Sequence, residues 1–327
     1  MGVDLFDELH RAEIGPILAV QELPGWLAPI MWAASAVGTD GAVLALLATL
    51  YWCVSPRMGI RLAVLVLLSA GLNAVAKLVF HAPRPAWIDA RVWVGSGEGS
   101  FGLPSGHAQT SVLACGAFAS LVRRPAVWWA AGVVAALISF SRVYLGLHFI
   151  SDVVAGALIG ALLLVLYLRY GDRLADRWRL LPLPAQILLS AVVAAALLVL
   201  GVLADALWQG WSLPSAWSGG GARDPAGLDR VIVMSGALFG TLAGASVMRE
   251  LGWFSASGGV GVRVLRWLLG MAGAVALWAL CGGLGDSMAA GVLRYTVVAA
   301  WAVLGAPLAF ARLGLVQARA TSGRRAP

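Results

Sequence analysis

Apolar residues in this chain form long runs instead of the short alternations that mark strands of a soluble core. Runs of roughly 20 apolar residues match the thickness of the hydrocarbon core of a bilayer. The pattern predicts about nine membrane spans, at residues 40–54, 59–80, 105–122, 125–142, 148–168, 183–204, 230–248, 264–283 and 288–310. The predicted fold class is therefore all-α, a polytopic transmembrane helix bundle.

The first segment has a different pattern. Residues 1–23 mix acidic and apolar positions at helical spacing, with Leu9, Ile14 and Ile17 among the apolar ones. This pattern is typical of an amphipathic helix on the membrane surface. Residues 24–54 are apolar but are interrupted by a polar stretch from Gly38 to Gly41. We expect a shallow first piece there, followed by the first span.

Polar stretches divide the predicted bundle into regions. We expect an N-terminal arm (1–23), a core (24–170), a basic cytoplasmic linker (171–182), an accessory four-helix membrane region (183–317) and a basic disordered tail (318–327). Two long connections, 81–104 and 205–229, interrupt the spans. In the seventh span Gly236, Gly240 and Gly244 recur every four residues, which predicts close approach of another helix.

Composition and charge support a membrane protein with a fixed orientation. Of 327 residues, 60% are hydrophobic, which excludes an ordinary soluble domain. The net charge of +7 comes from arginines that flank apolar runs, so it indicates topology instead of nucleic-acid binding. One predicted side carries fifteen basic and three acidic residues, and the other carries eight basic and thirteen acidic residues. The positive-inside rule makes the arginine-rich side, with the C-terminus, cytoplasmic.

Other sequence features set the expected compartment. The acidic start lacks a basic n-region, so we expect no cleavable signal peptide. Three scattered cysteines form neither a disulfide framework nor a metal-ligand spacing. We expect an integral protein of the bacterial inner (plasma) membrane.

Three polar runs lie at the ends of predicted spans, all on the extracytoplasmic side. They are Lys77-x6-Arg84-Pro85, Pro104-Ser105-Gly106-His107 and Ser141-Arg142-x5-His148-x3-Asp152. Because charges this close to a bilayer are costly unless paired or functional, we expect the runs to form one site.

A phosphate group explains the cations of that site. Lys77, Arg84 and Arg142 supply three positive charges, and arginine binds oxygens in a bidentate way. Ser105 suits the N-cap of the third span, where backbone N–H groups and the helix dipole favour an anion. Gly106 permits close approach of the backbone to a ligand.

The two histidines of the runs account for chemistry on that phosphate. His148 and Asp152 are four residues apart and therefore share one helix face. The carboxylate can fix the imidazole tautomer, which leaves the other ring nitrogen as a nucleophile. His107 is placed to protonate the leaving oxygen and later to activate water. Since lysine and arginine neutralise the phosphate, we expect no metal and no cofactor.

Together the three runs resemble, in order and without departure, the signature of the type 2 phosphatidic acid phosphatase superfamily. The resemblance implies a phosphohistidine at His148 and an acid at His107. It also implies phosphate ligands at Lys77, Arg84, Ser105, Gly106 and Arg142. The nine-span layout is similar to that of the glucose-6-phosphatase branch, although this second resemblance is only architectural.

These observations predict a membrane phosphatase that hydrolyses a lipid phosphate or polyprenyl diphosphate at the extracytoplasmic face. A sugar-phosphate phosphatase and a lipid phosphotransferase are alternatives within the enzymes. A lipid head-group transporter is the non-enzymatic alternative, but binding alone would need only the cations. The expected partners are the substrate and membrane lipids, with no nucleic acid; a homo-oligomer stays open.

Several polar residues near the runs allow two interpretations. His81 is interpreted as an interfacial histidine in preference to a substrate contact, and His10 is assigned no role. Asn73 either orients the lysine amine one turn away or has no such role. Gln109 and Thr110 either line the pocket or bond a neighbouring helix.

Further residues are assigned to packing. Trp87, Trp93 and Glu98 are interpreted as belt or loop residues in preference to a lid. Arg294 lies inside the ninth predicted span, where we expect it to pair with Asp286 or to snorkel to the interface.

Overall fold

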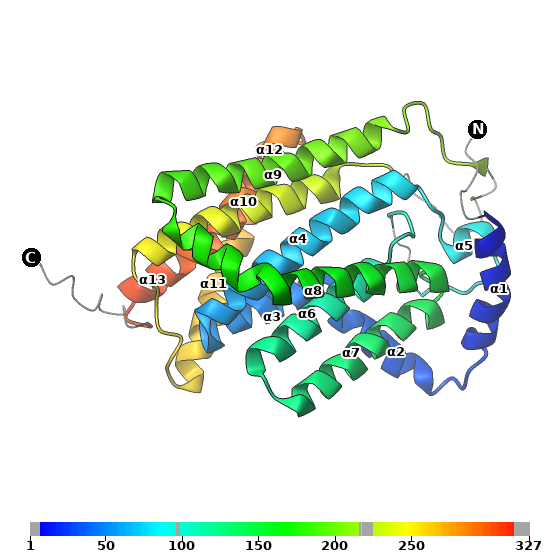
Figure 1. Ribbon diagram of the computed structural model, residues 1–327, viewed down its shortest axis with the longest axis horizontal. Coiled ribbons are helices and arrows are strands. Elements are labelled where there is room, and N and C mark those ends of the chain that lie inside the picture. Colours follow the sequence, from blue (N-terminus) through cyan, green and yellow to red (C-terminus); the bar gives the residue numbers. More distant parts are fainter. Residues whose placement is uncertain (1–6, 96–98, 216, 218–224, 317–327) are drawn as a thin grey trace, which may run out of the picture. The chain divides into compact units, whose positions relative to one another are not determined.

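The computed structural model describes residues 7–95, 99–215, 217 and 225–316, and these residues form helices and connections without a strand (Figure 1). Glu98 and the predicted tail 318–327 lie outside the described residues. The elements in order are α1 (Asp7–Gln21), α2 (Leu27–Val37), α3 (Asp40–Thr49), η1 (Leu50–Val54), α4 (Pro56–Phe80), α5 (Pro85–Ile88), α6 (Gly106–Val122), α7 (Pro125–Tyr144), α8 (Ile150–Leu180), α9 (Leu183–Ala206), α10 (Asp229–Glu250), α11 (Val260–Gly282), α12 (Met288–Ala300), η3 (Trp301–Gly305) and α13 (Ala306–Arg312).

The number of membrane spans differs from the sequence-based expectation. Among the described residues seven helices are long and apolar enough to cross a membrane, or up to eight with one bent pair. Nine spans are therefore not confirmed. The helix α6 has 17 residues, which at about 1.5 Å per residue falls short of a hydrocarbon core of roughly 30 Å.

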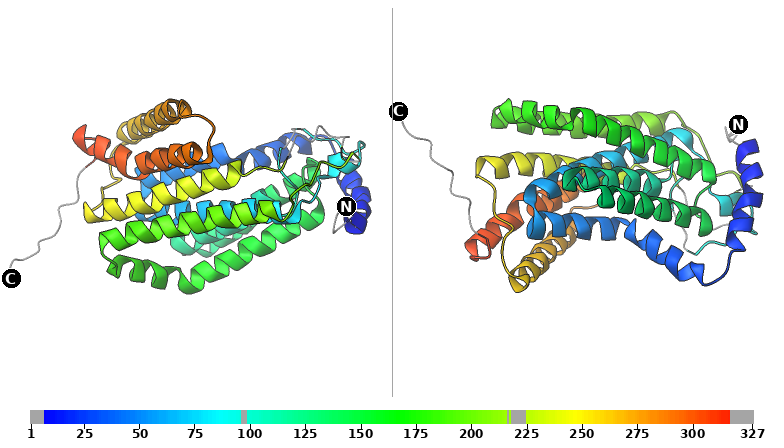
Figure 2. Two further views of the ribbon diagram at one scale, coloured as in Figure 1. Left: turned by 90° about the horizontal axis from the view of Figure 1, so that it is seen from above. Right: turned by 60° about the horizontal axis from the view of Figure 1, so that its bottom comes forward.

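The bent pair lies where the sequence predicted a shallow piece followed by a span. The segments Leu27–Val37 and Asp40–Val54 meet at an angle of 59° (Figure 2). The break falls on Gly38 and Thr39, where the Thr39 hydroxyl donates to the Ala36 carbonyl oxygen at 2.7 Å. The polar interruption of the sequence therefore bends the helix.

The described chain divides into two compact units. The first comprises the described residues up to Val43, Ser69–Asp172 and Val199–Val231. The second comprises Leu44–Leu68, Arg173–Leu198 and the described residues from Ile232 onward. All residues of the three motif runs belong to the first unit.

In the first unit, α1 buries one face, which does not coincide with all the apolar positions of the sequence. His10, Ile14 and Ile17 lie on one face and are buried against Val143 and Phe149, while Leu9 is exposed. The face that carries His10 therefore packs on the protein.

In the second unit, two of the three glycines of α10 allow the close helix approach that their spacing predicts, whereas a Cβ at Gly244 would make only ordinary contact with Val303. A Cβ atom at Gly236 or Gly240 would overlap backbone carbonyl oxygens of α12, those of Val292 and Thr296. Only glycine therefore lets these two helices pack so closely.

Two arginines of the second unit are part of its packing. Arg266 is buried, and its guanidinium donates to the carbonyl oxygens of Trp52, Ala256, Ser257 and Leu315. Arg294 donates to the Trp278 carbonyl oxygen at 2.9 Å and lies 4.0 Å over that ring. Arg294 thus makes a cation–π contact on α11; of the two expectations, pairing with Asp286 or snorkelling to the interface, the pairing is not the contact observed.

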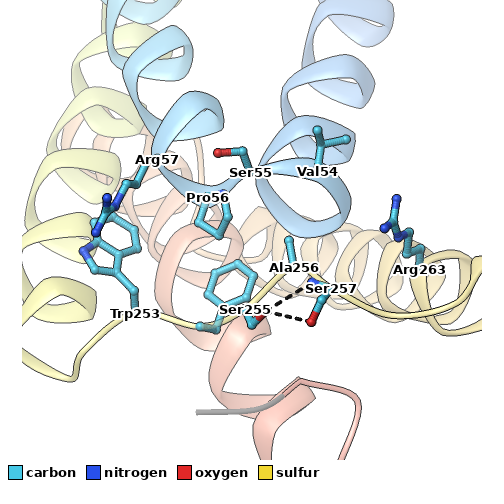
Figure 3. Close-up of a pocket in the computed structure, with 10 residues that line it drawn as sticks. Val54, Ser55, Pro56, Arg57, Trp253, Ser255, Ala256, Ser257 and Arg263 are labelled. Atoms are coloured by element: carbon cyan, nitrogen blue, oxygen red, sulfur yellow. Dashed lines mark hydrogen bonds between the residues drawn. The ribbon is translucent and has the colours of Figure 1, made fainter. Parts of the chain in front are cut away.

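A cavity of about 490 Å³ lies in the second unit (Figure 3). Its lining comes from Val54–Arg57, from Trp253–Ser257 and from Arg263. Arg57 and Arg263 lie on opposite sides of it in Figure 3. None of the motif residues line this cavity.

Candidate active site

Helix ends position the motif residues. Lys77 lies in the last turn of α4, and Arg142 in the last turn of α7. Ser105 is the N-cap of α6, and Asp152 lies in the first turn of α8. Arg84 has an extended backbone (φ −108°, ψ 157°) between two prolines, which disfavour a helical conformation there.

His148 and Asp152 form a buried pair. The His148 Nδ1 atom lies 3.1 Å from Asp152 Oδ2, with side-chain exposures of 2% and 0%. The same Oδ2 atom accepts the Phe149 backbone N–H at 3.0 Å. A carboxylate at Nδ1 favours the tautomer with a proton on that nitrogen, so the lone pair lies on Nε2.

Charge and burial keep the His148 imidazole neutral. Its pKa is held well below the usual range, first by burial and then by the charges of Arg84, Lys77, Arg142 and His107. The neutral ring is the form that a nucleophilic histidine requires.

Lys77 and Arg84 converge on one short segment. Lys77 Nζ donates to Ser100 Oγ at 3.0 Å and to the Phe101 carbonyl oxygen at 2.6 Å. Arg84 donates to the Ser100 carbonyl oxygen at 2.6 Å and to Ser100 Oγ at 3.0 Å. Its Nη1 atom donates to the Leu147 carbonyl oxygen at 2.8 Å and lies 3.5 Å from His148 Nε2. Both cations therefore lie beside oxygen atoms, and Arg84 lies next to the His148 ring.

The helix α2 also contributes to the site, which the sequence analysis missed. The buried Arg142 donates to Ser35 Oγ at 2.6 Å. At the end of α2, a Cβ atom on Gly38 would overlap the His107 ring. The interruption at Gly38 was visible in the sequence, but only as a break in a span.

The start of α6 has the features of an anion site. Ser105 is the predicted N-cap, but its hydroxyl makes no capping bond; it is buried and has no hydrogen-bond partner among the described residues. The first-turn N–H groups, including those of Gly106 and His107, lack acceptors within the helix because of helix geometry. A hydroxyl and several N–H groups are thus available to an anion.

Two glycines of α8 bring this turn to the His148–Asp152 pair. A Cβ atom on Gly156 would overlap the Ser105 carbonyl oxygen, and one on Gly160 would overlap that of Gln109. The Ser105 N–H also donates to the Asp152 carbonyl oxygen at 2.9 Å. The close crossing of α6 and α8 therefore fixes Ser105 next to Asp152.

Asn73 and Gln109 link α4 to α6. Asn73 Nδ2 donates to Gln109 Oε1 at 2.9 Å and to the Pro104 carbonyl oxygen at 3.2 Å. Gln109 Nε2 donates to the Ser69 carbonyl oxygen and hydroxyl at 2.9 and 3.0 Å. Gln109 thus bonds a neighbouring helix, and Asn73 holds the loop before Ser105.

An aromatic cluster covers the segment after Lys77. The buried His81, with φ 46°, lies 4.1 Å from the Phe101 ring and 4.5 Å from the Trp208 ring. Trp211 packs on both His81 and Phe101, and Trp208 Nε1 donates to the Val79 carbonyl oxygen at 3.0 Å. His81 therefore packs inside an aromatic cluster, where the sequence had suggested an interfacial histidine. The connection between α9 and α10 supplies the tryptophans.

The other loop tryptophans are also packed. Trp87 is buried with Phe101 and Trp217. Trp93 contacts Trp32 edge-on, and the backbone N–H of Trp93 donates to Gln21 Oε1 at 3.1 Å. These contacts agree with the preferred assignment to loop packing.

Comparisons with known proteins match the motif region and part of the second unit. The profile of the PAP2 superfamily matches residues 59–176, and that of the PAP2 superfamily phosphatase transmembrane extension matches residues 232–320. An undecaprenyl-diphosphatase of Sulfolobus acidocaldarius is 33% identical over 32% of this chain and 51% of its own length. A lipid phosphate phosphatase delta of Arabidopsis thaliana is 29% identical over 40% of this chain and 35% of its own length. A phosphatidylglycerophosphatase B of Bacillus subtilis is 34% identical over 24% of this chain and 42% of its own length.

The matched segments thus span about half, or less, of the length of these relatives. Within this chain the first profile contains every motif residue from Lys77 to Asp152, and the second covers α11 and α12 completely. With its membrane-spanning helices, the protein is an integral membrane protein, and it belongs to the PAP2 superfamily.

Proposed function

We propose that this protein is a metal-independent membrane phosphatase that hydrolyses a lipid phosphate or a polyprenyl diphosphate through a phosphohistidine. The observation that carries the proposal is the buried His148–Asp152 pair next to Arg84. A neutral imidazole whose Nε2 lone pair lies beside a fixed cation suits attack on a phosphorus atom.

The first step forms the phosphohistidine. Lys77, Arg84 and Arg142, with the Ser105 hydroxyl and the first N–H groups of α6, would bind the phosphate oxygens. The Nε2 atom of His148 forms a bond to phosphorus while the bond to the leaving oxygen breaks. His107 gives its proton to that oxygen, and Asp152 stabilises the positive charge that develops on His148.

The second step regenerates the enzyme. His107, now neutral, takes a proton from a water molecule that attacks phosphorus. The bond between phosphorus and His148 Nε2 breaks, inorganic phosphate leaves, and both histidines return to their starting states. If another lipid hydroxyl replaces the water, the same site performs phosphotransfer.

A lipid substrate is supported by the relatives, three of which are named for undecaprenyl diphosphate, lipid phosphate and phosphatidylglycerophosphate. The sugar-phosphate alternative rested on a nine-span layout, and the structure does not reproduce that count. The transmembrane-extension match instead links residues 232–320 to PAP2 superfamily phosphatases. We therefore retain the lipid substrate.

We also propose that the site faces the extracytoplasmic side of a bacterial inner membrane, with the C-terminus in the cytoplasm. The support is the excess of arginine in the connections predicted on the opposite side. Labelling of single cysteines placed at Arg91 and at Arg173, in intact cells and in lysed cells, checks this orientation. If Arg173→Cys but not Arg91→Cys is labelled in intact cells, the proposed orientation is wrong and the site faces the cytoplasm.

Phosphate release by the purified full-length protein tests the activity. The panel comprises a polyprenyl diphosphate, phosphatidate, phosphatidylglycerophosphate and glucose 6-phosphate, each with the wild type and with His148→Ala. We expect release from at least one lipid and none from glucose 6-phosphate, with loss in the variant. Equal release by both proteins would refute the enzyme. An added labelled acceptor lipid separates hydrolysis from phosphotransfer.

A further inference from the structure

Behind the His148–Asp152 pair lies a third histidine, His10, which comes from α1. Its side chain is fully buried, and its ring stacks on that of Phe149 with centroids 4.1 Å apart and an interplanar angle of 8°. Phe149 directly follows His148, and its N–H donates to Asp152 Oδ2 at 3.0 Å. Phe149 thus lies between His10 and the His148–Asp152 pair.

His10 also belongs to the electrostatic surroundings of Asp152. The Asp152 carboxylate is buried, and His10 is one of the ionisable side chains that interact with it, together with Arg84 and Lys77. In a buried site such interactions are screened less than in water, so they influence orientation as well as energy. The ionisable groups near Asp152 are therefore His148, Arg84 and Lys77 from the motif runs, and His10 from α1.

Polar bonds attach α1 to the start of α8. The Glu13 carboxylate accepts the Ser151 N–H at 3.1 Å and the Ser151 hydroxyl at 3.1 Å. Ser151 precedes Asp152, and an acidic side chain at a helix N-terminus is favourable. Farther along α1, Gln21 donates to the Trp93 and Tyr144 carbonyl oxygens at 2.7 and 3.2 Å.

Apolar packing adds to these bonds. Ile14 and Ile17 are buried with Val143 and Phe149, so the face of α1 that carries His10 is continuous with the core of the first unit. A histidine on such a face costs desolvation that a phenylalanine would not. Packing alone therefore does not account for an imidazole at this position.

We propose that His10 is a positioning residue for the His148–Asp152 pair. Its ring stacks on Phe149, whose N–H bonds Asp152 Oδ2, and its ring nitrogens favour the carboxylate orientation that receives His148 Nδ1. The proposal rests on the phosphatase function proposed above, and it assigns the N-terminal arm a part in the site.

His10→Phe is the informative variant because it keeps the stacked ring and removes the ring nitrogens. We expect kcat to fall about tenfold with KM within about twofold, because small misplacements of reacting groups lower rates to this extent. Ile17→Val is the matched control; it trims the same buried face and should leave kcat unchanged.

A double variant separates positioning from loss of structure. In the Asp152→Asn background, His10→Phe should cause no further loss, because its target carboxylate is gone. The same tenfold loss in both backgrounds, or a wild-type kcat for His10→Phe alone, would overturn the proposal.

A second readout does not depend on turnover. In full-length protein labelled with ¹⁵N-histidine, the ring nitrogens of His148 report its tautomer directly. We expect one tautomer in the wild type and a mixture in His10→Phe. If the tautomer is unchanged in the variant, the positioning role fails, whether or not the wild type releases phosphate. If phosphate release is absent but the tautomer shifts, only the proposed function fails.

Discussion

Lys77, Arg84 and Arg142 are held in two different ways. Lys77 and Arg84 share oxygen atoms of Ser100 and Phe101, whereas Arg142 bonds Ser35 on α2. Each guanidinium or amine is thus fixed before any phosphate arrives. Preorganised charges of this kind stabilise a transition state without reorganisation at the moment of reaction.

Removal of any one of the three cations should therefore slow turnover. We expect Lys77→Ala, Arg84→Ala and Arg142→Ala each to lower kcat by on the order of 10²–10³. Arg84→Lys should recover little, because lysine cannot reproduce the planar fork. Arg91→Ala is the control, since its exposed side chain pairs with Asp89. Wild-type rates in all three alanine variants, measured by phosphate release, would contradict the assignment of these three residues to phosphate binding.

The depressed pKa of His148 gives a pH dependence with a defined sign. The attacking form is the neutral ring, which is present above the pKa, and burial and nearby cations move that pKa well below 6.5. The value of kcat/KM, which reports the free enzyme, should therefore not fall at pH 6.5 because of His148. In Arg142→Gln one cation that lowers the His148 pKa is missing, so the acidic limb of the kcat/KM profile should move to higher pH. An unchanged acid limb in this variant would argue against the electrostatic effect.

At the scale of elements, α6 and α8 meet through glycine. We expect Gly156→Ala and Gly160→Ala to push the Ser105–His107 turn away from Asp152, because the added methyl group meets backbone oxygens. Stability and phosphate release should both fall, with a loss of stability of about 1–3 kcal/mol. Gly132→Ala on α7 has open space around its Cβ position and should be neutral or slightly stabilising. Thermal unfolding in detergent compares the three variants; equal behaviour would refute the close crossing.

The connection between α9 and α10 is expected to support the first motif run. Trp208 bonds the Val79 carbonyl oxygen and stacks on His81, which contacts Phe101. We predict that Trp208→Ala lowers thermal stability by about 1–3 kcal/mol and lowers activity, because Phe101 holds Lys77. Trp129, which is 79% exposed on α7, provides the control as Trp129→Ala. Wild-type stability and activity of Trp208→Ala would show that the packing of Trp208 on the first motif run is dispensable.

What the sequence could predict at this scale depends on the range of the contact. The spacing predicted that His148 and Asp152 share a helix face; they do pair, but α8 begins at Ile150, so His148 lies in the turn before the helix. Ser105 is the N-cap of α6 as its residue type predicts, although its hydroxyl makes no capping bond. The contacts of Arg142 with Ser35 and of His10 with Phe149 join residues more than 100 positions apart. They depend on which helices pack together, which apolar periodicity does not specify. The span count failed for a related reason, because a bend at Gly38 and the short α6 look like ordinary spans in hydropathy.

At the scale of the whole molecule, we compare the side chains that could bind a metal ion with the cations of the motif runs. The chain has sixteen acidic residues, four histidines and three cysteines. Within the part that the structure describes, no three of these side chains are grouped so that they could hold a metal ion. Three positive charges, those of Lys77, Arg84 and Arg142, lie instead at the motif runs and act on His148.

We therefore predict that phosphate release continues in EDTA at the rate measured without it, since three fixed cations neutralise the charge that a metal would otherwise neutralise. Vanadate, which can mimic the phosphoryl group in transfer, should inhibit competitively, and Arg84→Ala should weaken that inhibition together with turnover. Inhibition and turnover should weaken together, because vanadate bound away from Lys77, Arg84 and Arg142 would inhibit the Arg84→Ala variant as strongly as the wild type. Loss of activity in EDTA with recovery on addition of a divalent ion would refute the metal-independent mechanism.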